Sequence, residues 1–264
     1  GLEGLEPTIK IIKHTKKIAI ANKESIICGW FLIKRNLEKY NTKFIPIDSE
    51  HFSIWSLLQN FSTNDIEKIY ITASGGPFLN LPKKKFTNIS VKNALNHPNW
   101  RMGKKITIDS STLMNKVFEV IEAKNIFNLP FRKIAILTHP KSYVHSIIKF
   151  KTGLIKILVH EPDMKIPIFN SLYTEKQKFL RTSSLKLEVL NNLSLKVVDT
   201  KKFPSINILN SLPMFNSLFE TVLITINDFY VHKFLKNEIN FNNLIKNINI
   251  KLKKREFNKF KKLR

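Results

Sequence analysis

The sequence has few of the residues that stabilise secreted or membrane-embedded proteins. A single cysteine, Cys28, permits no internal disulfide bond and is typical of a reducing compartment. The longest uncharged apolar run, Ile26–Ile33, has 8 residues, whereas a transmembrane helix needs about 20. Only 7 glycines and 11 prolines occur in 264 residues, which excludes collagen-like and linker-like chains. With a hydrophobic fraction of 43%, the composition indicates a folded globular protein of one large or two smaller domains.

Acidic residues are also scarce, because 20 Asp and Glu face 44 Lys and Arg and leave a net charge of +24. Eleven of the basic residues follow position 232, and the other 33 are scattered through the chain. No aromatic and basic RNA-binding signature, zinc-finger spacing or leucine-zipper heptad accompanies them. We therefore expect a solvated basic surface without a nucleic-acid partner. Phosphate is the anionic substrate group that such a surface favours.

Two short apolar runs with a helical pattern between them, over residues 16–47, predict an α/β unit with a parallel sheet. Strands are expected at 16–20, 43–47, 68–72, 106–108, 133–137, 146–150 and 154–159, and helices at 25–40 and 111–127. Residues 78–105 have the length and polarity of a lid loop. Residues 174–199 are irregular, and helical spacing resumes near residue 206.

Three segments carry residues suited to chemistry. Asp48 and Glu50 directly follow an apolar strand, and carboxylates at a strand's carboxyl end can share a divalent cation. A solvated turn is the alternative for them. Asn115, Lys116 and Glu119 share one face of a helix whose start near Ser110 favours a phosphate. An ordinary capped helix explains that pattern equally well.

The third segment, Ser74-Gly75-Gly76-Pro77-Phe78, is a glycine turn after a strand, where backbone amides can approach an anion. A plain tight turn is the alternative. His97-Pro98-Asn99-Trp100 ends the long loop, and a tryptophan there could close over a ligand.

Together these segments resemble the 1-deoxy-D-xylulose 5-phosphate reductoisomerase family. The resemblance covers residues 1–173 in detail and the helical tail more loosely. It rests on the order and spelling of Ala21-Asn22-Lys23-Glu24-Ser25, Pro46-Ile47-Asp48-Ser49-Glu50-His51, Ser74-Gly75-Gly76-Pro77-Phe78, His97-Pro98-Asn99-Trp100-x-Met102-Gly103, Met114-Asn115-Lys116 and Glu161-Pro162-Asp163-Met164.

The resemblance implies an NADPH-dependent oxidoreductase and isomerase of isoprenoid biosynthesis by the non-mevalonate pathway. Its members convert 1-deoxy-D-xylulose 5-phosphate to 2-C-methyl-D-erythritol 4-phosphate with NADPH and Mn²⁺, Mg²⁺ or Co²⁺. The matching metal-ligand and catalytic positions are Asp48, Glu50 and Glu119. The matching substrate-binding positions are Lys23, Ser49, Glu50, Ser74, His97, Trp100, Ser110, Asn115, Lys116 and Glu119. The matching NADPH contacts are Asn22, Glu24 and Gly103.

The resemblance also implies the organisation of the chain. We expect the remnant of a Rossmann-like NADPH domain in residues 1–47 and a central α/β catalytic domain with the lid loop in 48–173. A linker at 174–199 and a small helical bundle at 200–264 follow. The family's Gly-rich dinucleotide turn is absent, so about a hundred residues are expected upstream, and the bundle is expected to be incomplete. A homodimer is implied for the full-length form, in the bacterial cytoplasm or the plastid stroma, without a membrane partner.

Besides a nucleic-acid binder driven by the charge of +24, two function classes stay open from the sequence. The chain is either part of an active reductoisomerase or a truncated, inactive module that binds a metal and a sugar phosphate without reducing it.

Overall fold

The computed structural model describes residues 1–173, 178–184 and 186–263, which divide into two compact units. The first unit comprises residues 1–73 and 122–197, and the second comprises residues 74–121 and 198–264. Residues 174–177 and 185 of the predicted linker lie outside the described residues. The four predicted segments follow family domains rather than these units, and their boundaries stay a prediction.

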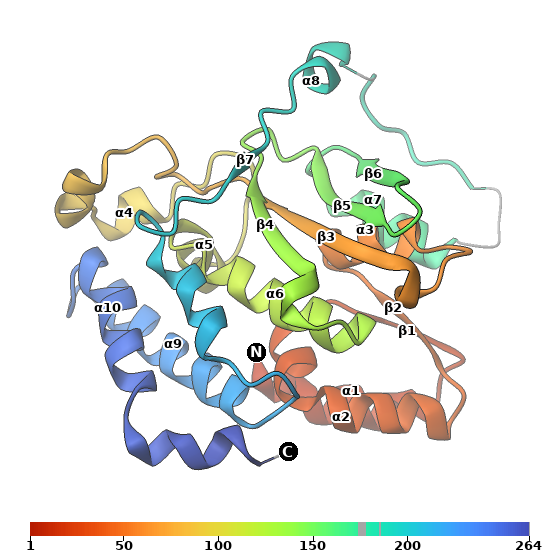
Figure 1. Cartoon of the computed structure of the whole chain (residues 1–264), viewed down its shortest axis with the longest axis horizontal. Helices are drawn as coiled ribbons and strands as arrows, with labels where there is room; N and C mark the ends of the chain where they lie inside the picture. Colours follow the sequence, from red (N-terminus) through yellow and green to blue (C-terminus); the bar gives the residue numbers. More distant parts are fainter. Residues whose placement is uncertain (174–177, 185, 264) are drawn as a thin grey trace. The chain divides into compact units, whose positions relative to one another are not determined.

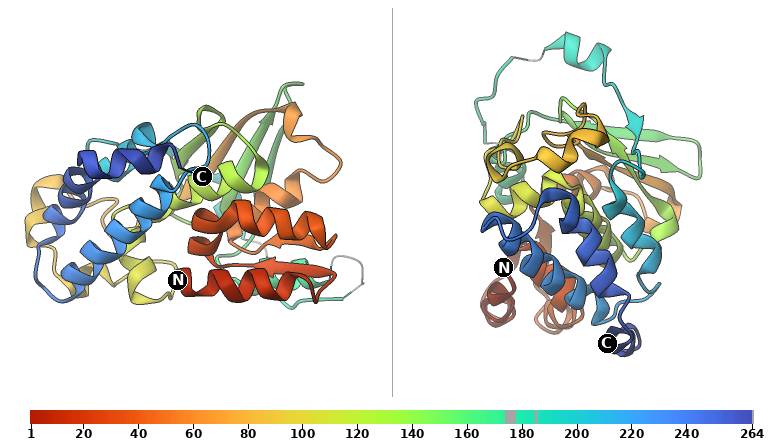
Figure 2. Two further views of the ribbon diagram at one scale, coloured as in Figure 1. Left: turned by 90° about the horizontal axis from the view of Figure 1, so that it is seen from below. Right: turned by 90° about the vertical axis from the view of Figure 1, so that its left-hand side faces the viewer.

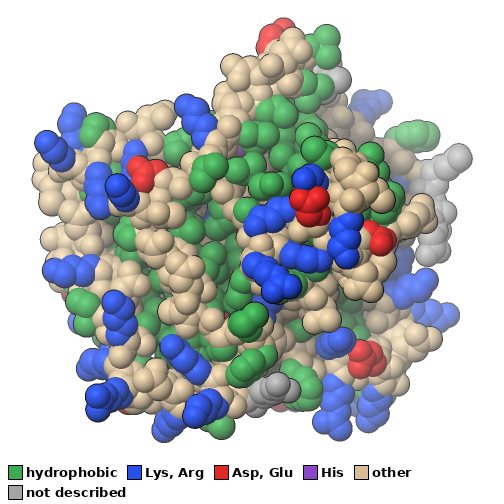
Figure 3. Space-filling model, viewed as in Figure 1, with side chains coloured by type: hydrophobic (Ala, Val, Ile, Leu, Met, Phe, Trp, Pro, Cys, Tyr) green, Lys and Arg blue, Asp and Glu red, His purple; other side chains and the backbone are tan. Residues whose placement is uncertain are grey.

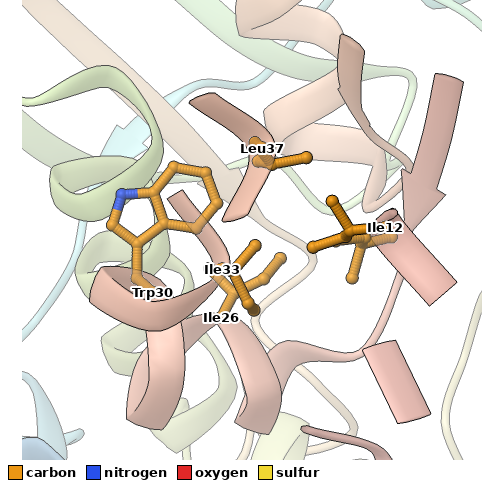
Figure 4. Close-up of a cluster of buried hydrophobic side chains, with 6 residues drawn as sticks. Ile12, Ile26, Trp30, Ile33 and Leu37 are labelled. Atoms are coloured by element: carbon orange, nitrogen blue, oxygen red, sulfur yellow. The ribbon is translucent and has the colours of Figure 1, made fainter. Parts of the chain in front are cut away.

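The first unit begins with a small two-stranded parallel sheet. Strand β1 (Lys17–Ile20) pairs with β2 (Lys43–Pro46), and helix α2 (Lys23–Lys39) connects the two strands. Helix α1 (Leu5–Ile12) lies beside α2 (Figure 2). The helices share a core because their apolar residues recur at helical spacing. That core contains the buried side chains of Ile12, Ile20, Ile26, Trp30, Ile33 and Leu37 (Figure 4). The predicted strand–helix–strand arrangement is confirmed.

A second, five-stranded sheet completes the first unit, in the order β6-β5-β3-β4-β7 (Figure 1). The central strand β3 (Ile66–Ala73) is parallel to β4 (Ile134–Thr138) and antiparallel to β5 (Val144–Phe150). Strands β6 (Ile155–Val159) and β7 (Lys196–Val197) form the edges. The unit also holds α3 (Ser49–Leu57), the last turns of α6 (Met114–Phe127), α7 (Lys165–Leu172), α8 (Leu187–Asn191) and the short 3-10 helices η1 (Leu2–Gly4), η2 (Thr63–Asp65) and η4 (Phe131–Lys133).

The second unit is mainly helical. Two antiparallel helices, α9 (Phe219–Leu235) and α10 (Phe241–Leu252), lie side by side (Figures 1 and 2). Aromatic rings hold the unit together, since Phe241 packs against Phe78, Phe86 and Phe234 with ring centroids 5.1 to 5.8 Å apart. The other elements are η3 (Lys83–Asn88), α4 (Val91–Ala94), α5 (Lys104–Ser111), the start of α6, η5 (Pro204–Ser211) and η6 (Arg255–Lys261). The predicted helical C-terminal region is confirmed.

The expected strand at 106–108 is wrong, because these residues form the middle of helix α5. Packing decides the outcome: Asp109 is buried and accepts a hydrogen bond from Asn227 of α9 (2.8 Å). Ser110 consequently lies in the last turn of α5, and not at a helix N-terminus as the sequence suggested. Helix α6 begins at Met114, after Leu113 adopts a positive φ of 59°.

Two further expectations need correction. The long loop at 78–105 contains η3 and α4, and the start of α5. The irregular stretch at 174–199 contains α8 and the edge strand β7, which pairs with β4. Strand β7 is only two residues long, so no apolar periodicity announces it. The remaining predicted strands and the helices at 25–40 and 111–127 are confirmed, with ends that shift by a few residues.

None of the helices within residues 1–173, 178–184 and 186–263 has both the length and the apolar content to cross a membrane. Lysine and arginine side chains are spread over the face in Figure 3, where acidic side chains are few.

Candidate active site

Two carboxylates follow strand β2 in the first unit. Asp48 is the N-cap residue of α3, and Glu50 lies in the first turn of this helix. An N-cap aspartate usually accepts a hydrogen bond from its own helix, but the Asp48 side chain makes no such bond. Glu50 is buried and accepts a hydrogen bond from the Ser49 hydroxyl (2.7 Å). A solvated turn therefore does not describe these residues, because Glu50 is buried and the Asp48 carboxylate does not cap its helix.

Lys23 brings a buried positive charge to Asp48. It is the first residue of α2, where the helix dipole disfavours a cation. The Lys23 Nζ donates to Asp48 Oδ2, and to Glu122 Oε2 at 2.7 Å. Two carboxylates thus compensate for the unfavourable position of the ammonium. The predicted substrate-binding residue Lys23 and the predicted metal ligand Asp48 lie together in the first unit.

Glu122 and His51 belong to the same cluster, although neither was predicted as a site residue. One side-chain atom each of Asp48, His51 and Glu122 lies within 4.8 Å of the others. Glu122 is only 1% exposed, and this burial raises its pKa to about 8, although the Lys23 ammonium acts in the opposite direction. Glu122 follows the predicted ligand Glu119 by three residues on α6, and that helical spacing is the signal that could have identified it.

The second unit contributes a polar turn after strand β3. The Ser74 hydroxyl accepts a hydrogen bond from the Gly76 N–H (3.1 Å) and contacts His97 Nε2 (3.1 Å). His97 Nδ1 accepts hydrogen bonds from the backbone N–H groups of Asn99 (3.2 Å) and Trp100 (3.0 Å). A neutral imidazole that accepts at Nδ1 carries its proton at Nε2. His97 therefore donates to Ser74 through Nε2.

Burial and the charge of Lys116 lower the pKa of His97 to about 4. His97 is therefore neutral at pH 7, which agrees with the tautomer that its hydrogen bonds require.

Gly76 brings this turn against the end of helix α5. It has a positive φ of 64°, and a Cβ atom there would lie 2.9 Å from the Ser110 carbonyl oxygen. Only glycine tolerates both the conformation and the approach. The turn therefore places two predicted substrate-binding residues, Ser74 and Ser110, in neighbouring segments of the second unit.

The predicted face of α6 is confirmed by its contacts. Asn115 Nδ2 donates to Glu119 Oε1, and the Lys116 ammonium pairs with the Glu119 carboxylate. Lys116 and Glu119 are both buried. An exposed Lys–Glu pair on an ordinary helix does not describe this arrangement, because a buried charge pair requires mutual compensation.

Trp100 and Gly103 line a cavity of about 570 Å³ in the second unit, together with His97, Met102 and Thr107. Gly103 is the N-cap residue of α5, and no atom lies within 4 Å of the place where its Cβ would be. This cavity thus unites three of the predicted residues, His97, Trp100 and Gly103.

The predicted NADPH contacts Asn22 and Glu24 open helix α2. The Asn22 side chain accepts from the Ser25 N–H (3.2 Å) and caps the helix. Glu24 lies in the first turn, next to Lys23. Their place after the carboxyl end of β1 is where parallel α/β sheets bind ligands.

Three family profiles match the chain. They are described as 1-deoxy-D-xylulose 5-phosphate reductoisomerase for residues 1–29, the C-terminal domain of that enzyme for residues 44–127, and the DXP reductoisomerase C-terminal domain for residues 159–264.

Curated relatives carry the same name. The chain is 61% identical over 265 residues to 1-deoxy-D-xylulose 5-phosphate reductoisomerase of Pelagibacter ubique (strain HTCC1062). The match covers 100% of this chain and 68% of the relative. The enzyme of Sulfurihydrogenibium sp. (strain YO3AOP1) is 42% identical, with 98% of this chain and 68% of the relative covered.

Solved structures agree. DOX-P reductoisomerase with fosmidomycin and magnesium has a TM-score of 0.89 and 31% identity, over 100% of this chain and 67% of the other. The Zymomonas mobilis enzyme in complex with NADPH has a TM-score of 0.86 and 31% identity, over 96% of this chain and 65% of the other.

The chain thus spans about two thirds of the length of the proteins that it matches. The identity to curated relatives, the three matched segments and the shared fold lead to one conclusion. This chain belongs to the 1-deoxy-D-xylulose 5-phosphate reductoisomerase family.

Proposed function

We propose that the chain carries the metal- and substrate-binding part of an enzyme that converts 1-deoxy-D-xylulose 5-phosphate to 2-C-methyl-D-erythritol 4-phosphate with NADPH. The observation that carries this proposal is the Asp48 carboxylate, which stands at a helix N-cap without capping and instead contacts the buried Lys23. Similar enzymes bind NADPH, magnesium and fosmidomycin. These comparisons favour the reductoisomerase over an inactive binding module.

Asp48, Glu50 and Glu119 are the proposed ligands of a divalent cation. All three offer carboxylate oxygens, the donors that Mg²⁺ and Mn²⁺ prefer. Asp48 and Glu50 share the start of α3, and Glu119 stands on α6 one turn before Glu122. When bound, the cation supplies a Lewis acid that polarises the substrate carbonyl. The donor chemistry of the residues therefore fits the metal of the family.

The second unit supplies donors for the substrate phosphate. Lys116 contributes a positive charge. The neutral ring of His97 holds the turn at Ser74 through its hydrogen bond with the Ser74 hydroxyl. The other proposed substrate-binding residues of this unit are Ser74, Trp100, Ser110 and Asn115. In the first unit, Lys23 and Ser49 are the proposed contacts to the rest of the substrate. Each of these groups binds or orients the sugar phosphate without changing its own protonation state.

Asn22, Glu24 and Gly103 are the proposed contacts to NADPH. Asn22 and Glu24 stand at the beginning of α2, and Gly103 opens α5 beside the cavity that contains Trp100. In this proposal Trp100 covers the bound sugar and excludes water from it.

We also propose a homodimer and the cytoplasm of a bacterium as the compartment. The bacterial origin of the matched relatives supports the compartment.

Calorimetry with 1-deoxy-D-xylulose 5-phosphate and Mn²⁺ tests the function. Binding is expected to require Mn²⁺ and to be lost in Glu119→Gln, which removes one negative ligand. Glu67→Gln changes an exposed carboxylate on β3 and serves as the matched control. Equal binding with and without Mn²⁺, or unchanged binding in Glu119→Gln, would contradict the assignment of the ligands.

A further inference from the structure

Lys23 is held by two carboxylates that have unequal roles. Asp48 is a proposed metal ligand, and its oxygens are needed by a cation. Glu122 has no role in the proposed function, yet its Oε2 lies 2.7 Å from the Lys23 Nζ. The side chain of Glu122 is 1% exposed. A second carboxylate therefore holds the same ammonium from inside the protein.

The backbone around Glu122 is well anchored to the helix that carries Lys23. Asn125, three residues further on α6, donates a side-chain hydrogen bond to the Ile26 carbonyl of α2 (3.3 Å). Lys23 and Ile26 are themselves three residues apart on α2. The two helices are thus joined by two polar contacts one turn apart, which fixes Glu122 opposite Lys23.

Stability alone does not account for this carboxylate. A buried ion pair costs desolvation energy, and well-packed apolar residues often serve the fold equally well. The ammonium also stands in the first turn of α2, which the helix dipole disfavours. Desolvation and the helix dipole therefore both disfavour the positive charge that the protein keeps at this place.

We propose that Glu122 is a positioning residue for Lys23, and that it holds the ammonium in place when Asp48 binds the divalent cation. The hydrogen bond from the Lys23 ammonium to the buried Glu122 Oε2 is charge-assisted because the ammonium carries the charge, and it defines the position of a flexible lysine side chain. The Asn125 contact fixes α6 against α2, and Glu122 accepts the hydrogen bond from the Lys23 ammonium. The inference rests on the proposed function, in which Lys23 contacts the substrate.

The first test needs no ligand. The exchange of the Lys23 ammonium protons with water is measured by ¹H–¹⁵N NMR of the full 264-residue chain, with Lys23→Met for the assignment. The ammonium of Asp48→Asn is expected to stay protected, because Glu122 still holds it. Exchange in Asp48→Asn/Glu122→Leu is expected to be at least about tenfold faster, since the Glu122 acceptor and the Asp48 charge are both gone. Loss of protection in Asp48→Asn alone would overturn the proposal.

The second test is a double-mutant cycle on fosmidomycin binding with saturating Mg²⁺. Glu122→Leu, which removes the acceptor, is expected to weaken binding by about 10- to 100-fold, the range of one hydrogen bond to a charged group. The same substitution is expected to have no effect in a Lys23→Met background. A merely structural role would weaken binding equally in both backgrounds, and that result would overturn the proposal.

Thr42→Val is the matched control, because it removes a buried hydrogen bond of the first unit, to the Ile12 carbonyl (2.9 Å), without touching Lys23 or α6. It is expected to lower the thermal stability and to leave the affinity for fosmidomycin within about threefold. If the unmodified chain fails to bind fosmidomycin with Mg²⁺, the proposed function fails. The exchange measurement then still decides whether Glu122 positions Lys23.

Discussion

The two halves of the candidate site differ in their charge. In the first unit, Asp48 and Glu122 both contact the Lys23 ammonium, and a third acidic residue, Glu50, follows Asp48 at the start of α3. In the second unit, one carboxylate, Glu119, is already paired with Lys116, and the other groups are hydroxyls, an amide and a neutral histidine. The acidic set suits a divalent cation, and Lys116, the hydroxyls and the amide of the second set suit a phosphate. Glu119, proposed above as a metal ligand, is the exception in the second unit.

This comparison shows how a basic protein can still build a cation site. The net charge of +24 makes an isolated carboxylate cluster uncommon in this chain. Clustering occurs because Asp48 and Glu50 follow the end of β2, and Glu119 and Glu122 are three residues apart on α6. Local arrangement, rather than total charge, therefore determines what each half binds.

The largest expected effect is on the cation site. Asp48→Asn removes a negative ligand, so the affinity for Mn²⁺ is expected to fall by at least about 100-fold, more than when a group that only orients a ligand is lost. Calorimetric titration with Mn²⁺ measures this, with Glu38→Gln on the exposed side of α2 as the control. Similar affinities in Asp48→Asn and the control would break the contrast between the two halves.

The phosphate half is tested by Lys116→Met, which keeps the length of the side chain and removes its charge. Affinity for the phosphorylated substrate is expected to fall by about 10- to 100-fold, because a charge-assisted hydrogen bond is lost. Affinity for Mn²⁺ alone is expected to change far less. A larger loss of Mn²⁺ affinity than of substrate affinity would show that the two halves are not specialised in this way.

Gly76→Ala addresses the frame of the phosphate half. The added Cβ would lie 2.9 Å from the Ser110 carbonyl oxygen at a φ of 64°, so the free energy of unfolding is expected to fall by about 1–3 kcal/mol. Urea denaturation measures it. Gly153→Ala is the control, because its φ is 87° and no atom lies within 4 Å of the new Cβ. Equal losses would mean that backbone strain alone, and not the approach to Ser110, is responsible.

The last prediction concerns the protonation of His97. Its pKa in the folded chain is about 4, below the usual value of about 6.5, because of burial and Lys116. Between these values the unfolded chain binds the proton and the folded chain does not, so stability decreases as the pH falls from about 6.5 to about 4.

Below that interval His97 makes no further contribution to the slope. Urea denaturation at several pH values measures this dependence, and His97→Gln is expected to reduce it. The same slope in both proteins would contradict a neutral His97. An NMR titration of the imidazole gives its pKa directly.

Sequence patterns predicted the parts of the fold that local periodicity controls. The strand–helix–strand unit at the start, the central strands and the C-terminal helices all have apolar spacings that match their structure. The strand expected at 106–108 failed because Ile106 and Ile108 alternate like a strand, whereas Asp109 is buried against Asn227 of α9. That contact joins residues 118 positions apart, so no local window contains it.

For the candidate site, the sequence by itself determined the residue types, their spacing and the family to which the motifs belong. Asp48, Glu50, Asn115, Lys116 and Glu119 were identified in this way, because neighbours on one strand end or one helix face are close in sequence. Only the tertiary structure decided that Glu122 contacts Lys23, that His97 is neutral and that Ser110 ends a helix. Burial and contacts between distant segments set these properties, and neither is encoded in the local order of residues.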